Sequence, residues 1–159
     1  MFRILALVTL PLVLALPARA AVEIQPVVSP LGQTAWLVED RTIPMVALEL
    51  VFFGGAVLDR PGGEGAVSLM TSLLSEGAGD LDAQGWAAAV EDTAGSVGFS
   101  SGRDTVTLTI RALSENLDEV LELARLALAE PGFEAQAVER VRGQALSSLQ
   151  RAARNPNAI

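Results

Sequence analysis

The chain has 159 residues, with 11 basic side chains that are all arginine, 19 acidic side chains, no histidine and no cysteine, and its formal net charge is −8. This length favours one domain of moderate size, and the acidic balance argues against nucleic acid or an anionic membrane surface as a partner. Without imidazole or thiol groups, the chain can form no Ser-His-Asp or Cys-His centre and no zinc site built on such ligands.

The first twenty residues have the pattern of a secretory signal. A positive start is followed by an almost uninterrupted apolar run, and Ala18 and Ala20 are the small residues that a signal peptidase recognises. The run of about 13 apolar residues is too short to span a bilayer, which needs roughly 20. We therefore expect residues 1–20 to be a signal peptide, residues 21–159 to be one exported, periplasmic domain, and no stable membrane span. Nine arginines and nineteen acids then remain, a formal charge of −10.

Three strands are predicted next. Residues 22–28 and 33–39 are β-rich runs separated by Ser-Pro-Leu-Gly, which favours a hairpin. Residues 46–52 alternate between apolar and mixed side chains, which is typical of a strand with one buried face, and a pair of glycines ends the run.

Two helices follow. Apolar residues at helical spacing predict a helix over residues 66–74, and the glycines of 77–79 end it. Asp82 is then expected to cap a second helix, which carries Trp86 inward and ends before Gly95.

The second half of the chain is predicted to contain two more strands and then two more helices. Residues 96–101 and 104–112 are predicted to be strands joined by a turn at Gly102, and Ser114 is expected to cap a helix that ends near residue 130. A last helix is predicted over residues 134–153, with a buried stripe made of Val138, Val141, Leu146 and Leu149. The predicted fold class is α+β, with helices packed on one side of a mainly antiparallel sheet.

The remaining side chains leave several interpretations open. Four acids along one predicted helix suit either a solvated face or a patch for a cation or a partner; these are Glu115, Asp118, Glu119 and Glu122. Trp36 and Trp86 suit either core packing, which is favoured, or a binding surface. Glu64 and Glu76 lie about three helical turns apart, too far to share a substrate bond.

Several short runs, taken together, resemble the insulinase or pitrilysin family of zinc peptidases, and specifically its N-terminal half-domain. Their order and spacing carry the resemblance more than any single match does. The matching runs are residues 33–40, 43–48, 53–59, 65–77, 131–134 and 139–142. On this resemblance the chain covers about one half-domain, and we expect it to be a truncated or incomplete member.

The resemblance also locates the family's metal ligands. Active members use an inverted motif, His-x-x-Glu-His, in which two imidazoles bind zinc and the glutamate activates water. Those three positions are Ser68, Thr71 and Ser72 in this chain, and the position of the distal glutamate ligand is Ser148. Neutral hydroxyls neither bind Zn²⁺ tightly nor act as a general base near neutral pH. No catalytic residue and no metal are therefore expected in this chain.

The architecture of the family implies a non-catalytic role for this chain. Its members work as clamshells made of two facing pieces, sometimes on separate subunits of which one carries zinc. The chain is therefore expected to be the non-catalytic subunit of such a pair, with zinc in the partner, and to help enclose extended peptides. The resemblance places Val97, Gly98, Phe99 and Ser100 in the strand beside the substrate, although an ordinary sheet strand with a glycine fits equally well.

Two other interpretations are open. The chain can be a stand-alone binding or structural module that kept the fold and lost the chemistry. It can also be a peptidase in its own right, which metal analysis of the purified protein would test.

Overall fold

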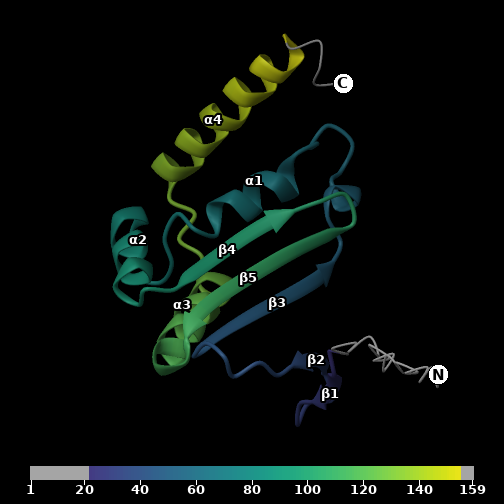
Figure 1. The fold of residues 1–159 in the computed structure, drawn as a ribbon. Helices are drawn as coiled ribbons and strands as arrows, with labels where there is room; N and C mark the ends of the chain where they lie inside the picture. The colour runs from purple at the N-terminus through teal and green to yellow at the C-terminus, as the bar shows by residue number, and fades with distance from the viewer. Residues whose placement is uncertain (1–21, 155–159) are drawn as a thin grey trace, which may run out of the picture. The chain divides into compact units, whose positions relative to one another are not determined.

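A computed structural model describes residues 22–154 of the chain (Figure 1). The predicted signal peptide lies outside the described residues. The described chain divides after Thr42 into two compact units, an N-terminal hairpin and a larger α+β unit that begins at Ile43. Each unit is described by itself.

The N-terminal unit is the predicted hairpin. Strand β1 (Ile24–Val28) pairs antiparallel with β2 (Thr34–Val38), and Ser29 N–H donates to Gln33 O (2.8 Å) to close the turn. The expectation that Trp36 packs in a core is wrong, because this side chain is 73% exposed. A two-stranded ribbon of five-residue strands has no second layer of its own to cover a large ring.

The larger unit contains one antiparallel sheet with the strand order β3-β5-β4. Its strands are β3 (Met45–Phe53), β4 (Ser96–Ser101) and the central β5 (Thr105–Leu113). Leu108 and Ile110 of β5 are almost completely buried, while Thr107 and Thr109, which alternate with them, lie on the opposite, open face. The period-two pattern in the sequence therefore predicted which face of the sheet is covered.

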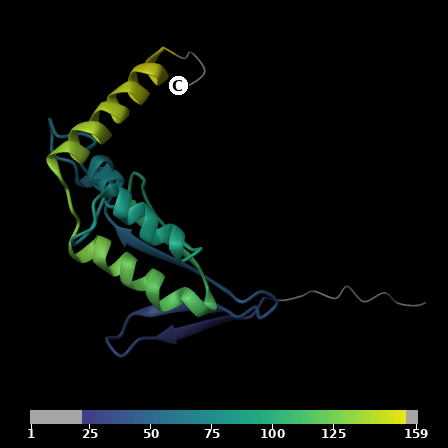
Figure 2. The same cartoon turned by 90° about the vertical axis from the view of Figure 1, so that its left-hand side faces the viewer.

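Within the described residues, four α-helices accompany this sheet: α1 (Ala66–Leu73), α2 (Ala83–Asp92), α3 (Leu117–Ala129) and α4 (Ala135–Ala153). Val120 and Ala124 of α3 pack on Leu108 and Ile110, and Trp86 of α2, which is 3% exposed, packs on Ala127 of α3. Helices α2 and α3 share the apolar face of the sheet, and α1 runs alongside β4 (Figures 1 and 2). The α+β prediction with helices on one side is confirmed. No described helix has both the length and the apolar character of a membrane span.

Two details of the helix predictions are wrong. Ser114 does not cap α3, because residues Ser114–Asn116 form a 3₁₀ turn (η2) and α3 begins at Leu117 with no side-chain cap. The buried stripe of α4 covers only its first half, since Leu146 and Leu149 are 50% and 66% exposed. The reason is length, because at ~1.5 Å per residue α4 spans about 28 Å and its partner α1 about 12 Å.

The turn between β4 and β5 is held by the segment that follows β3. Gly102 N–H donates to Thr105 O (2.8 Å) and closes the turn, as expected for a turn at Gly102. Three backbone N–H groups of the following segment donate to the turn's carbonyls: Gly54 to Asp104 (2.8 Å), Ala56 to Gly102 (3.1 Å) and Val57 to Arg103 (3.0 Å). Gly55 is buried against the same carbonyls, and a Cβ there would clash with Gly102 O and lie 2.7 Å from Arg103 O.

The surroundings of two glycines predict opposite effects on stability when each is changed to alanine. Gly55→Ala forces the turn away and is expected to lower the free energy of unfolding by about 1–3 kcal/mol, as overpacking does. Gly143→Ala places a methyl group in open space on α4 and is expected to raise it by ~0.5–1 kcal/mol through helix propensity. Urea denaturation followed by circular dichroism measures both. Equal stability of the Gly55→Ala variant and the wild type would contradict the packing described for the turn.

Candidate functional site

The site predicted from the sequence centres on α1, whose start is fixed by a distant carboxylate. Helix α1 has no side-chain N-cap of its own, because Gly65 occupies the cap position in a left-handed conformation (φ 89°). Asp59 accepts hydrogen bonds from the N–H groups of Gly65 (2.7 Å) and Val67 (2.9 Å) in its place. These bonds satisfy N–H groups that a helix start leaves without partners. They also place the negative charge of Asp59 at the positive end of the helix dipole, which is a favourable interaction.

Helix α4 packs across α1 through a small apolar contact. Leu73 of α1 lies against Ala137 and Val141 of α4, and all three side chains are 5–6% exposed. Leu69 and Val138 flank this contact and are half-buried. The burial of these apolar side chains stabilises the pairing of α1 with α4, and this contribution does not require a metal or another bound group.

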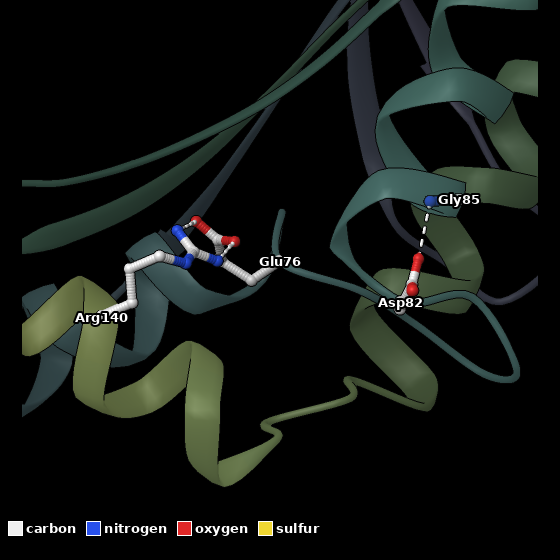
Figure 3. A network of polar contacts seen from close by, with 4 residues as sticks. All are labelled: Glu76, Asp82, Gly85 and Arg140. Atoms are coloured by element: carbon white, nitrogen blue, oxygen red, sulfur yellow. Dashed lines mark hydrogen bonds and ion pairs between the residues drawn. The ribbon is translucent and has the colours of Figure 1, made fainter.

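An ion pair closes the C-terminal end of the same contact. Arg140 donates to both carboxylate oxygens of Glu76, with Nη1 to Oε1 at 3.2 Å and Nη2 to Oε2 shorter (Figure 3). The hydrogen bond to Glu76 raises the pKa of the Arg140 guanidinium above its ordinary value. A bidentate pair of this kind fixes the angle between its partners as well as their distance. No local pattern in the sequence indicates this ion pair, because the two residues are 64 positions apart.

A second polar contact in the same view fixes the next helix. Asp82 Oδ1 accepts from Gly85 N–H (2.8 Å), which confirms the predicted cap of α2 (Figure 3).

The four hydroxyl positions are placed as follows. Ser68 and Ser72 are exposed on α1, Thr71 is only 2% exposed, and Ser148 is exposed on α4. Ser72 and Ser148 line one hollow of about 200 Å³, together with Glu76 and Val141. The structure thus brings together Ser72 and Ser148, which lie on different helices and which the resemblance assigned to the second and the distal ligand positions. Two larger hollows, of about 380 and 530 Å³, lie elsewhere and include none of the four positions.

These hydroxyls do not fit a zinc ion. Thr71 Oγ1 donates to Val67 O (2.8 Å) and Ser72 Oγ donates to Ser68 O (2.9 Å), so both are bonded to their own helix. Ser148 Oγ accepts from Arg151 Nη2 (2.9 Å), which places a guanidinium where a cation would bind. Zinc needs thiolate, imidazole or carboxylate ligands, and no step through a metal can be built on these groups. Across residues 22–154, no group of three acidic side chains is arranged to hold a metal ion.

Strand β4 carries the predicted substrate residues and forms one edge of the sheet. Because Gly102 N–H bonds to Thr105 O, the alternation of an antiparallel ladder makes Gly98 and Ser100 the residues bonded to β5. Val97, Phe99 and Ser101 then direct their backbone N–H and C=O groups away from β5. In the described part of the chain, these outward groups have no hydrogen bond beyond the sheet.

The side chains of β4 divide between the two faces. Val97 and Phe99 are half-buried and pack in the core with α2 and α3, whereas Gly98 and Ser100 are exposed on the open face. The four residues therefore form no common side-chain pocket. What they share is one stretch of edge backbone on the side of the sheet along which α1 runs (Figure 1).

The acidic residues of α3 do not gather around this site. Arg125 donates to both carboxylate oxygens of Glu122 at 2.7 and 2.8 Å within the helix, and this lowers the pKa of Glu122. Such a pair is typical of a solvated helix face.

The α+β fold, with its three-stranded antiparallel sheet and accompanying helices, agrees with the class of protein that the sequence resembles: an N-terminal half-domain of the inverted-zinc-motif peptidases. The family model described as insulinase, peptidase family M16, matches residues 35–159. The chain belongs to the insulinase family.

Individual relatives agree with this assignment. The chain is 31% identical over 111 residues to a Helicobacter pylori protein described as the non-peptidase homologue YmxG, and the match covers 70% of this chain and 26% of that protein. The crystal structure of an inactive peptidase M16 domain from Pseudomonas fluorescens matches with a TM-score of 0.77 and 26% identity, over 84% of this chain and 33% of that one. A protease structure from Helicobacter pylori shares the fold at 18% identity, with a TM-score of 0.72, over 86% of this chain and 33% of that one.

The chain therefore spans about a quarter of the length of the curated relative and a third of the length of each solved chain.

The juxtaposition of α1 and α4 predicts that a zinc site can be rebuilt. A variant with Ser68→His, Ser72→His and Ser148→Glu is expected to retain about one zinc ion per chain, since two imidazoles one turn apart and a facing carboxylate form a three-ligand site. The wild type and the variant with only the two histidines are expected to lose zinc during gel filtration in the presence of a weak chelator. Metal analysis of the eluted protein measures this. A folded triple variant without zinc would contradict the alignment of Ser148 with the distal ligand.

Proposed function

We propose that this chain is an exported, non-catalytic subunit of the insulinase family that pairs with a zinc-bearing homologue to form a peptide-degrading chamber. The proposal rests on one observation: the helices of the family fold are present, but hydroxyl residues stand at the positions that the resemblance assigns to the metal ligands. Helices α1 and α4 bring Ser72 and Ser148 to one hollow, yet the hydroxyls of Thr71 and Ser72 are bonded to carbonyls of their own helix. A chain of this kind contributes shape and backbone to the chamber, and its partner contributes the metal.

The chemistry of the four positions supports the absence of catalysis. A general base must accept a proton near neutral pH, and a serine or threonine hydroxyl does so only beside another activating group. The Thr71 hydroxyl already donates to a backbone carbonyl and is buried, so no substrate reaches it. The description of one relative as a non-peptidase homologue, and of another as an inactive domain, is consistent with this role.

The peptide-holding part of the role is assigned to the edge of β4. An extended peptide can add to this edge as a further strand, in which the main chain supplies the hydrogen bonds and needs no catalytic side chain. Val97 and Phe99 present the backbone groups for such pairing on the α1 side of the sheet. The expected ligand is therefore an extended peptide segment, not a folded protein surface.

Co-expression with a zinc-bearing family member from the same genome tests the pairing. The two chains are expected to co-purify as a complex of fixed stoichiometry, with zinc in the partner alone and peptide hydrolysis only by the complex. The matched control is the same partner with its metal-binding histidines replaced, which should still assemble but should not hydrolyse peptide. A monodisperse, partner-free protein in such an experiment would contradict the proposal and favour a stand-alone binding module.

The mode of peptide binding is tested with backbone-methylated peptides. A fluorescent seven-residue peptide of alternating threonine and valine is titrated against the full chain by fluorescence anisotropy. N-methylation of residues that pair with Val97 or Phe99 removes a donor from the new ladder and is expected to weaken binding about tenfold. N-methylation of the residue between them should have a much smaller effect, because that residue makes no bond to β4. Equal weakening at adjacent positions would exclude binding as an added strand.

A further inference from the structure

Gly98 holds a special position on the edge strand. It pairs with Thr109 of β5 in the hydrogen-bonded arrangement, so a strand added antiparallel on the other side would meet Gly98 in the non-hydrogen-bonded arrangement. In that arrangement the two α-carbons come closest, about 4.5 Å apart, and their side chains make the tightest cross-strand contact.

The surface around Gly98 is open, and on this face of the sheet the neighbouring strands carry two exposed charges of opposite sign, Arg111 on β5 and Glu49 on β3. A Cβ on this residue would have Thr109 O as its nearest neighbour, at 4.0 Å, so the floor beneath it is sheet backbone. The neighbours on the same face of β4 are Ser96 and Ser100, both exposed and both small. Neither β4 nor α1 carries a charged residue. Backbone left bare by a glycine in a sheet is stabilised when an aromatic ring from the neighbouring strand covers it.

We infer that the peptide position opposite Gly98 takes a large aromatic side chain, and that this position sets the specificity of the edge. The ring would lie over Gly98 and the Thr109 side chain, between the small hydroxyls on either side. A charged side chain gains little at this position, because β4 and α1 carry no charge and the two charges on this face, Arg111 and Glu49, are exposed to solvent and opposite in sign. The inference rests on the proposed peptide-holding role of β4 and adds the class of side chain that it selects.

The inference is tested with three seven-residue peptides that share alternating threonine and valine and carry phenylalanine, alanine or glutamate at the centre. The probe is the fluorescent phenylalanine peptide, and the other two compete against it for the full chain. The phenylalanine peptide is expected to bind about fivefold more tightly than the alanine peptide, and the glutamate peptide to bind no better than alanine.

Two variants distinguish a specific contact at Gly98 from non-specific hydrophobic binding. In Gly98→Val the new side chain covers the bare backbone. The ratio of this variant's affinities for the phenylalanine and alanine peptides is therefore expected to fall to about one. Gly98 is not among the glycines with positive φ, and its surroundings are open, so this variant should fold, which circular dichroism and urea denaturation verify. Ser96→Val adds similar bulk to the same face but leaves Gly98 bare, and its ratio should stay near that of the wild type.

The outcomes distinguish this inference from the proposal beneath it. If none of the three peptides binds the wild-type chain, the peptide-holding role of β4 fails, and the inference fails with it. If all three bind with equal affinity, and binding is still weakened by N-methylation at alternate positions, the edge binds peptides but Gly98 selects nothing. If the preference for phenylalanine over alanine is kept in Gly98→Val but lost in Ser96→Val, the aromatic ring contacts Ser96 and the inference is wrong.

Discussion

The docking of the segment after β3 onto the β4–β5 turn is the constraint on which the rest of the larger unit depends. Three backbone hydrogen bonds and the missing side chain of Gly55 bring this segment within contact of residues 102–104. The contact holds the β4–β5 turn, the turn sets the register of β4 against β5, and the register decides which backbone groups of β4 point outward. The same segment leads to Asp59, whose carboxylate sets the first residue of α1. One local packing arrangement therefore positions both the edge strand and the helix that lies beside it.

The pairing of α1 with α4 does not depend on a metal. Leu73 and Val141 bury the contact, and Glu76 and Arg140 close it with a bidentate ion pair. In a zinc peptidase of this fold, ligands on the two helices are also joined through the metal, whose binding energy contributes to folding. In this chain side-chain packing and one ion pair supply the connection, so hydroxyl residues at the positions that the resemblance assigns to the ligands are compatible with the same helix pairing.

Local signals in the sequence predicted local structure well. Alternation gave the strands and the covered face of the sheet, Gly102 gave the turn, and Asp82 gave the start of α2. The errors arise where burial depends on a partner that the local pattern does not describe. An apolar stripe shows which side of α4 is suited to packing, but α1 is too short to reach Leu146 and Leu149. For the same reason the link between Glu76 and Arg140, 64 positions apart, had no sequence signal.

The family resemblance assigns the ligand positions to four hydroxyl residues, and the structure explains how a loss of metal ligands and the proposed peptide binding are compatible. Zinc ligands are side chains, so four substitutions are sufficient to remove the chemistry. The hydrogen bonds that an edge strand offers belong to the main chain, and no substitution short of proline removes them. At Gly98 the argument goes one step further, because the absence of a side chain exposes backbone that an incoming ring can cover. Selectivity for a peptide therefore needs main-chain groups and the space above one glycine, and it does not need the side chains that would bind zinc.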